Sequence, residues 1–237
     1  KIVALSFSTE LLIFSRYPRL GKVKTRLSNI LAPETCLALH NALLLDTLDR
    51  ILLLRGDLHL FLADCSLDDV EMFTQTMRVS TNIRIHRQEG EGLGQRMWNA
   101  YRKVSRESKR VLFLGSDTPS LPLDYVQQAL KKLDHFPVVI GPSDDGGYYL
   151  LAISQEKKRL FENIDWGTET VLEQTLSRLN KGEYWLLPRW YDIDRGLDLE
   201  RLGIDLQTHF KGFPHRTKRF WDRLQQKRAL ECPDQAP

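Results

Sequence analysis

Residues 141–152 read GPSDDGGYYLLA; they include the end of one apolar run, FPVVIGP at residues 136–142, and most of a second, GYYLLAI at residues 147–153. Short apolar runs of this kind, bounded by turn residues, predict two strands joined by a short loop. The loop contains two adjacent carboxylates, Asp144 and Asp145, directly before two glycines that let the backbone turn and approach a ligand closely. A simple turn and a polar site for a cation or a substrate hydroxyl are both consistent with this pattern.

On either side of this stretch, short apolar runs alternate with segments of helical periodicity. The runs predict strands at residues 10–16, 57–64, 82–88, 110–117, 136–142, 147–153 and 183–194. Apolar residues at helical spacing predict helices at residues 32–54, 66–77, 93–108, 122–133, 167–180, 196–206 and 217–230. This alternation is typical of an α/β fold with a mostly parallel sheet. Ligands of such sheets bind at the carboxyl ends of the strands, where we expect the functional residues.

The composition is that of an ordinary globular protein. The 237 residues carry a formal net charge of +3, which is too small to predict nucleic-acid binding. Three widely spaced cysteines, Cys36, Cys65 and Cys232, form no CxxC pair, so we expect neither a disulfide framework nor a zinc site but a reducing compartment. No apolar run reaches the ~18 residues of a membrane span, so no transmembrane segment is expected.

The beginning of the sequence and its basic end also bear on localisation and domain organisation. Residues 1–14 read KIVALSFSTELLIF; polar residues interrupt this run and no small-residue cleavage site follows it, so we expect no signal peptide and a cytoplasmic protein. We expect one domain at residues 1–206 and a basic helical extension at residues 207–237. An amphipathic helix docked on its own domain is the expected form of this extension.

Basic residues follow the first predicted strand. The loop at residues 15–27, SRYPRLGKVKTRL, places Arg16, Lys22, Lys24 and Arg26 around Gly21. Backbone amides near a glycine, together with fixed cations, can hold phosphate groups. The spacing matches neither the P-loop nor the GxGxxG fingerprint, and a solvated basic loop is an equally good interpretation.

Aspartates follow two later strands. Asp117 ends the run RVLFLGSD, where it could bind Mg²⁺ or Mn²⁺ together with phosphate oxygens, or could cap the next helix. Asp192 and Asp194 stand two apart in YDIDRGLDL, so on a strand their side chains would share one face. Two carboxylates on one face are unfavourable without a cation or base between them, although Asp194 or Asp198 could also be a helix cap.

Six motifs in the same order give the sequence a resemblance to a known family. The order is PRLGKVKTRL, QEGEGLGQRM, GSDTPSLP, GPSDDGGYYLLA, IDWGTETVLEQTL and YDIDRGLDL. It resembles the bacterial GT-A-type, glycosyltransferase-like family called domain of unknown function 2064. That family is similar to phospholactate guanylyltransferases and molybdenum-cofactor nucleotidyltransferases. The resemblance implies a single three-layer α/β/α sandwich around a mostly parallel sheet, the GT-A or nucleotide-diphospho-sugar transferase fold.

The resemblance also implies roles for individual residues. It implies a metal, Mg²⁺ or Mn²⁺, on Asp117 and Asp194, although the usual TPE after the second aspartate is replaced by Arg195-Gly196-Leu197. The expected nucleotide-binding residues are Arg16, Gly21, Lys24, Arg26, Gly92, Leu93 and Gly94. The expected catalytic residues are Lys24, Asp117, Asp144 and Asp145. The expected acceptor-binding residues are Gly146, Gly147, Tyr148, Trp166, Thr168 and Glu169.

Two transfer reactions fit these expectations. In nucleotidyl transfer, an acceptor phosphate attacks the α-phosphorus of a nucleoside triphosphate, and pyrophosphate leaves. In glycosyl transfer, an acceptor hydroxyl attacks C1 of a nucleotide sugar, the nucleoside diphosphate leaves, and Asp144 or Asp145 takes the hydroxyl proton as base. The expected partners are therefore a nucleotide or nucleotide sugar and a small acceptor.

Two other classes of protein are also considered. A catalytically degenerate module that senses nucleotide is the main alternative. A phosphatase with Asp117 as nucleophile is disfavoured, because Pro119 stands where its second acid is expected.

Overall fold

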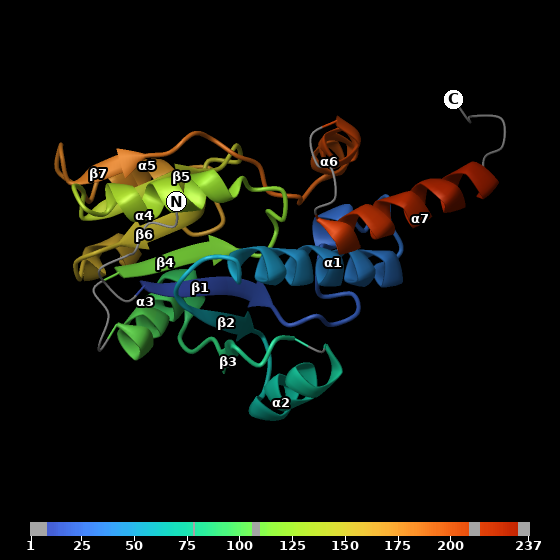
Figure 1. Cartoon of the computed structure of the whole chain (residues 1–237), viewed down its shortest axis with the longest axis horizontal. Coiled ribbons are helices and arrows are strands. Elements are labelled where there is room, and N and C mark those ends of the chain that lie inside the picture. Colours follow the sequence, from blue (N-terminus) through green and yellow to red (C-terminus); the bar gives the residue numbers. More distant parts are fainter. Residues whose placement is uncertain (1–8, 78, 106–109, 209–213, 232–237) are drawn as a thin grey trace.

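A computed structural model describes residues 9–77, 79–105, 110–208 and 214–231. Its sheet has seven strands in the order β3-β2-β1-β4-β6-β5-β7, and all of them except β6 run parallel (Figure 1). The strands are β1 (Thr9–Arg16), β2 (Asp57–Ala63), β3 (Ile83–Arg87), β4 (Arg110–Gly115), β5 (Val138–Pro142), β6 (Tyr148–Ile153) and β7 (Tyr184–Leu186). The predicted α/β class and mostly parallel sheet are confirmed.

Helices cover both faces of the sheet and form the outer layers of the expected sandwich. The helical segments are η1 (Thr25–Leu27), α1 (Pro33–Ile51), α2 (Leu67–Thr76), α3 (Gly92–Val104), α4 (Leu123–Lys132), η2 (Lys158–Phe161), α5 (Val171–Leu176), α6 (Gly196–Thr208) and α7 (His215–Glu231). One buried cluster joins the sheet to α1, α2 and α4, and a second joins it to α3, η2 and α5. Apolar side chains on both faces explain why the central strands read as continuous apolar runs.

The stretch at residues 141–152 lies where the sheet changes direction. β6 pairs antiparallel with both β5 and β4, so residues 143–147 connect two neighbouring strands at the carboxyl edge of the parallel strands. The register shifts between Gly141 and Pro142. A Cβ atom at Gly141 would stand 2.3 Å from the ring of Tyr149, so only glycine allows this close packing.

The final helix packs against the first. Trp221 and Leu224 of α7 lie in a third buried cluster that also contains Leu27, Leu39 and Tyr191. The docking of the basic extension on its own domain is therefore confirmed for residues 214–231. The division into a domain at residues 1–206 and an extension stays a prediction, and residues 209–213 and 232–237, with Cys232, lie outside the described residues.

Two predicted elements are shorter than expected. The predicted strand at residues 183–194 contributes only Tyr184–Leu186 to the sheet, plus one isolated bridge at Trp190, because Pro188 cannot donate a ladder hydrogen bond. Asp192 and Asp194 thus lie in a loop, not on a strand. The predicted helix at residues 167–180 begins only at Val171, after a turn in which Gly167 has φ of +86°.

Two predicted segments extend beyond the residues that the structure describes. Residues 106–108 of the predicted helix 93–108 and residues 1–8 of the amino-terminal run lie outside it. Within the described residues, no helix is both long and apolar enough to cross a membrane.

Candidate functional site

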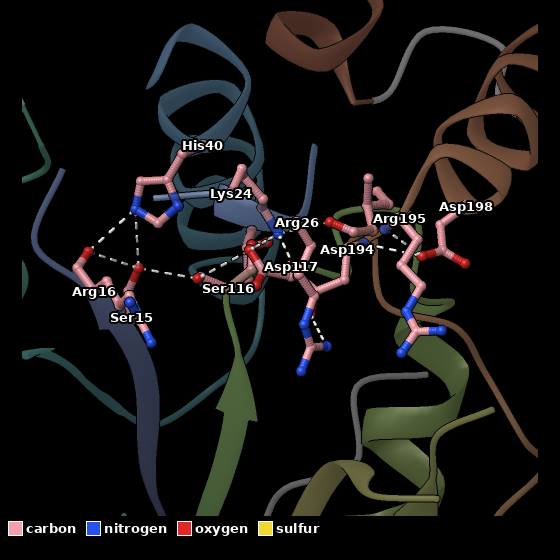
Figure 2. Close-up of polar contacts among 12 residues, drawn as sticks. Ser15, Arg16, Lys24, Arg26, His40, Ser116, Asp117, Asp194, Arg195 and Asp198 are labelled. Carbon is pink, nitrogen blue, oxygen red and sulfur yellow. Dashed lines mark hydrogen bonds and ion pairs between the residues drawn. The ribbon is translucent and has the colours of Figure 1, made fainter. Parts of the chain in front are cut away.

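The loop after β1 brings a buried lysine under the carboxyl edge of the sheet. Lys24 adopts a left-handed conformation with φ of +50° directly before η1. Left-handed backbone is unfavourable for a residue with a Cβ atom, so surrounding contacts have to hold it. The side chain is only 2% exposed and points towards the loops that follow β4 and β7 (Figure 2).

All three protons of the Lys24 ammonium have acceptors. Nζ lies 2.6 Å from the carbonyl oxygen of Ile193, 2.8 Å from Asp117 Oδ1 and 3.2 Å from Asp194 Oδ1. Burial alone would lower the pKa of Lys24, but the two carboxylates outweigh burial and the pKa is raised. Lys24 is therefore a charged cross-link between the two aspartates, and it can contact a phosphate only by releasing one of these acceptors.

Asp117 is held by Lys24 and does not cap a helix. Helix α4 begins at Leu123 after Pro122, and no side chain caps it, so the alternative interpretation of Asp117 as its cap is wrong. Burial would raise the pKa of Asp117, but the charge of Lys24 and hydrogen bonds from Lys24 and Ser116 hold it below its usual value. The carboxylate stays charged at neutral pH and remains about one third exposed.

A hydrogen-bonded chain lies behind Asp117. Ser116 Oγ donates to Ser15 Oγ at 2.9 Å, and Nε2 of His40 lies 3.5 Å from Ser15 Oγ and 3.1 Å from the carbonyl oxygen of Arg16. Burial lowers the pKa of His40, so its imidazole is neutral. Figure 2 shows this chain beside the Lys24 cluster. Sequence reasoning missed these three residues, because nothing in their spacing distinguishes them from core residues.

Asp194 binds the exposed cation of the same loop. Its Oδ2 lies 3.2 Å from Nη1 of Arg26, whose side chain is 52% exposed. Asp198 lies in the first turn of α6, and its Oδ2 accepts the backbone N–H groups of Asp194 and Arg195 at 3.1 and 2.7 Å. Asp198 thus fixes the backbone at Asp194, while the Asp194 carboxylate faces the basic loop (Figure 2).

The two aspartates of the 143–147 loop face different ways. Asp144 Oδ2 lies 2.8 Å from Arg201 Nη1, an exposed ion pair on α6. Asp145 Oδ1 accepts hydrogen bonds from the Ser143 hydroxyl and, at 3.1 Å, from the backbone N–H of Gly147. Both residues are exposed, but Asp145 turns back on its own loop, whereas Asp144 turns towards α6.

Asp192 is the buried acid of the site, and it was absent from the residues expected to act. Burial and the nearby charges of Asp117 and Asp145 raise the pKa of Asp192 to about 7. Ser143 Oγ contacts both Asp145 and, at 3.1 Å, Asp192, yet the hydroxyl carries one proton. A proton on Asp192 satisfies both contacts, in agreement with the raised pKa.

The expected acceptor residues lie together over the same loop. A Cβ atom at Gly146 would stand 2.1 Å from the carbonyl oxygen of Glu169, and Gly146 accepts the backbone N–H of Leu172. Tyr148 and Trp166 meet edge to face at 6.2 Å, and burial raises the pKa of Tyr148. The hydroxyl of Thr168 donates to the carbonyl oxygen of Asp165 within the turn before α5.

The expected nucleoside residues open α3. Gly92 has φ of +72°, and Leu93 is partly exposed. Gly94 packs so tightly that a Cβ atom there would stand 2.5 Å from Nε1 of Trp166, which links this segment to the acceptor residues. Gln88 ties the preceding loop to the sheet, because its side-chain amide donates to the carbonyl oxygen of Ser15 at 3.2 Å.

Two residues of the expected phosphate loop lie apart from the Lys24 cluster. Arg16 is exposed, and its Nη1 donates to the carbonyl oxygen of Lys22 at 3.3 Å. Gly21 has φ of +70° with open space beside it, so it shapes the turn of the loop. The structure thus brings together Lys24, Arg26, Asp117 and Asp194, and it places Asp145 beside Asp192.

Comparison with known proteins gives a family. The family model described as an uncharacterized protein conserved in bacteria, DUF2064, matches residues 47–168. The chain belongs to this family. No protein with a curated description matches the sequence significantly.

Solved structures share the fold. A structure from Desulfovibrio desulfuricans G20, assigned provisionally as a nucleotide-diphospho-sugar transferase, is 31% identical with a TM-score of 0.82, over 94% of this chain and 96% of that one. The 4-diphosphocytidyl-2C-methyl-D-erythritol synthase of Anaerococcus prevotii is 13% identical with a TM-score of 0.55, over 84% of this chain and 96% of that one. A CMP-2-keto-3-deoxy-manno-octonic acid synthetase complexed with CTP is 13% identical with a TM-score of 0.51, over 86% of this chain and 100% of that one. The family member therefore has the fold of nucleotide-utilising transferases.

Proposed function

We propose that this protein is a metal-dependent nucleotidyltransferase, which transfers a nucleotidyl group from a nucleoside triphosphate to a small acceptor. The observation that carries the proposal is the meeting of Lys24 and Arg26 with Asp117 and Asp194 at the carboxyl edge of the sheet. A cationic loop facing two carboxylates suits a triphosphate that arrives with a divalent cation. The relative that is 31% identical supports the wider class, transfer from an activated nucleotide.

The basic loop would bind the phosphate chain. The guanidinium of Arg26 is half exposed, so it can turn from Asp194 to phosphate oxygens at little cost. Lys24 would turn to the phosphate chain only after its ammonium releases its contacts with Asp117 and Asp194. The Arg26 guanidinium and the Lys24 ammonium would then neutralise charge that develops on the leaving pyrophosphate as the acceptor oxygen forms its bond to the α-phosphorus.

The donor set fits a divalent cation. The described residues contain no ready-made group of three metal-ligating side chains, but Asp117 and Asp194 already share one cation, the Lys24 ammonium. Carboxylate oxygens are the ligands that Mg²⁺ and Mn²⁺ prefer, and Mg²⁺ at nucleotide sites commonly has only one or two protein carboxylates. When bound, the metal would supply charge neutralisation at the phosphates. Asp117 and Asp194 would hold it, and Asp198 keeps the backbone of Asp194 in place.

Glycosyl transfer is the second candidate, and Asp145 favours it. Ser143 and the Gly147 backbone N–H hold the Asp145 carboxylate near the residues expected to bind the acceptor, where it could accept the proton of an attacking hydroxyl. A nucleotide sensor with the same fold would keep the Lys24 cluster without turnover. The three functions share one site, so only products separate them.

The test incubates the full chain with each nucleoside triphosphate and with nucleotide sugars, in the presence of Mg²⁺ or Mn²⁺. We expect a rise in melting temperature with at least one triphosphate and metal, and pyrophosphate release when an acceptor mixture is added. Release of a nucleoside diphosphate from a sugar donor would instead support the second candidate, and binding without either product would support the sensor.

A matched pair of variants ties the result to the site. Asp117→Asn should lose the metal-dependent part of the melting shift. Asp57→Asn, at the amino end of β2 and so at the opposite edge of the sheet, should keep it. The proposal is overturned if no nucleotide shifts the melting temperature at millimolar concentration, or if both variants behave alike.

A further inference from the structure

A groove of about 550 Å³ lies between α1 and α7, outside the site described above. The helices are antiparallel, since Arg216 near the start of α7 contacts Asp46 and Asp49 near the end of α1, and Lys227 lies with Glu34 at the other end of the groove. In Figure 1, α7 projects past the amino-terminal end of α1. The volume is in the ~300–1,000 Å³ range of small-molecule sites.

The spacing of residues on both helices explains the groove. On α1 the lining positions recur at helical spacing, and three of them, Thr35, Ala38 and Ala42, carry short side chains that leave space open. On α7 the facing stripe is Arg216, Arg219, Phe220, Arg223, Leu224 and Lys227. The groove therefore has an apolar floor and one cationic edge, an arrangement that an amphiphile with a negative head matches.

Two of these cations have no counter-charge of their own. Arg216 is paired with Asp46 and Asp49. Arg219 and Arg223, one helical turn apart and both exposed, have no carboxylate in ion-pair contact among the residues that the structure describes. The side-chain oxygen of Asn41, which also lines the groove, is buried without a hydrogen-bond partner in the same part of the chain. A phosphate would pair with the two arginines, and a hydroxyl beside it could donate to Asn41.

We infer that the α1–α7 groove docks the protein on an anionic membrane by taking up one phosphate-headed lipid. The phosphate lies on Arg219 and Arg223, and part of an acyl chain lies against Ala38 and Phe220. A recessed apolar floor of ligand size favours a lipid over an acidic protein, which would need a flat patch of ~800 Å². Exposed lysine and arginine side chains on the same helix add attraction to anionic headgroups.

The test measures co-sedimentation of the full chain with vesicles of phosphatidylcholine mixed with phosphatidylglycerol, and with phosphatidylcholine alone, at physiological salt. We expect binding to the first only. Arg219→Gln with Arg223→Gln should weaken this binding roughly tenfold or more. The matched control, Arg55→Gln with Lys131→Gln, removes the same charge from exposed positions outside the groove and should bind like the parent. Ala38→Trp, which fills the groove and keeps every charge, should also weaken binding.

Several results would overturn the inference. Equal binding to both vesicle types, equal loss in the arginine pair and the control pair, or unchanged binding of Ala38→Trp would each do so. Binding of polyglutamate through Arg219 and Arg223 without vesicle binding would show an acidic protein partner instead. Melting temperatures of all variants check that each is folded. Vesicle binding is measured without nucleotide, so its failure leaves the proposed transferase function untouched.

Discussion

Replacing Lys24 by methionine tests whether the ammonium is the cross-link of the site. Methionine keeps most of the side-chain volume, but Asp117, Asp194 and the Ile193 carbonyl lose their shared donor. Removing one partner of a fully buried ion pair costs ~3–5 kcal/mol. Here each carboxylate is about one third exposed and can regain water, so we expect a loss of about 2–3 kcal/mol in the free energy of unfolding at pH 7. For a chain of this size that corresponds to a drop of roughly 4–12 °C in melting temperature.

The loss should depend on pH in a defined direction. In the parent protein the pKa of Asp117 is lowered, so its contribution to stability is present above about pH 4 and is lost only as the pH falls through the lowered folded pKa. In the variant, burial without the ammonium raises the pKa of Asp117. The deficit should therefore be largest near pH 7 and should shrink towards pH 5, as the unpaired carboxylate takes up a proton.

Urea unfolding at several pH values measures both quantities. Arg26→Met is the matched control, because it removes an exposed cation from the same aspartate and should cost less than about 1 kcal/mol. The reasoning is refuted if Lys24→Met is within about 0.5 kcal/mol of the parent at pH 7, if its deficit does not shrink towards pH 5, or if Arg26→Met costs as much.

Three further predictions concern single residues. Gly146→Ala should lower the free energy of unfolding by more than about 2 kcal/mol, because its Cβ would strike the Glu169 carbonyl, whereas Gly167→Ala, with a similar φ and open space, should cost about 1 kcal/mol; urea unfolding compares them. Burial lowers the pKa of His86 to about 4. The free energy of unfolding should therefore fall by up to ~3 kcal/mol as the pH drops from about 6.5 to 4. His86→Phe should show a flatter pH dependence of the melting temperature in thermal melts. Asp192 has a pKa raised to about 7, so stability should fall as the pH rises from about 4 to 7; Asp192→Asn should be more stable than the parent at pH 8 without metal, by about 2–4 kcal/mol, and a lower melting temperature there would contradict this.

The fold was predictable because its signals are local. Buried parallel strands such as β4 are apolar along their length, and Ser66 with Asp69 forms a capping box at the start of α2. The prediction failed at residues 187–194, which read as a strand but lie mainly outside the sheet. There Pro188 interrupts pairing and the pairing partner, β5, is short, and neither effect follows from apolar patterning.

The site was only partly predictable, for a different reason. The order of motifs indicated that Lys24, Asp117 and Asp194 belong to one site, although 170 positions separate the first from the last. The Lys24 ammonium engages all three of its protons from a backbone in the left-handed conformation. No sequence pattern predicts this conformation at a lysine. The burial of Asp192 and the outward turn of Asp144 depend in the same way on tertiary packing that local patterns do not contain.

The third buried cluster connects the basic loop before α1 and the acidic loop after β7 with the final helix, α7. Leu27 follows Arg26, Ile193 lies between Asp192 and Asp194, and both pack in one cluster with Trp221 of α7. Close-packed side chains transmit displacement with little compression. A rotation or tilt of α7 would therefore displace the basic loop before α1 and the acidic loop after β7 together. Any ligand that binds α7 would in this way change the distances between Lys24 and the carboxylates of Asp117 and Asp194.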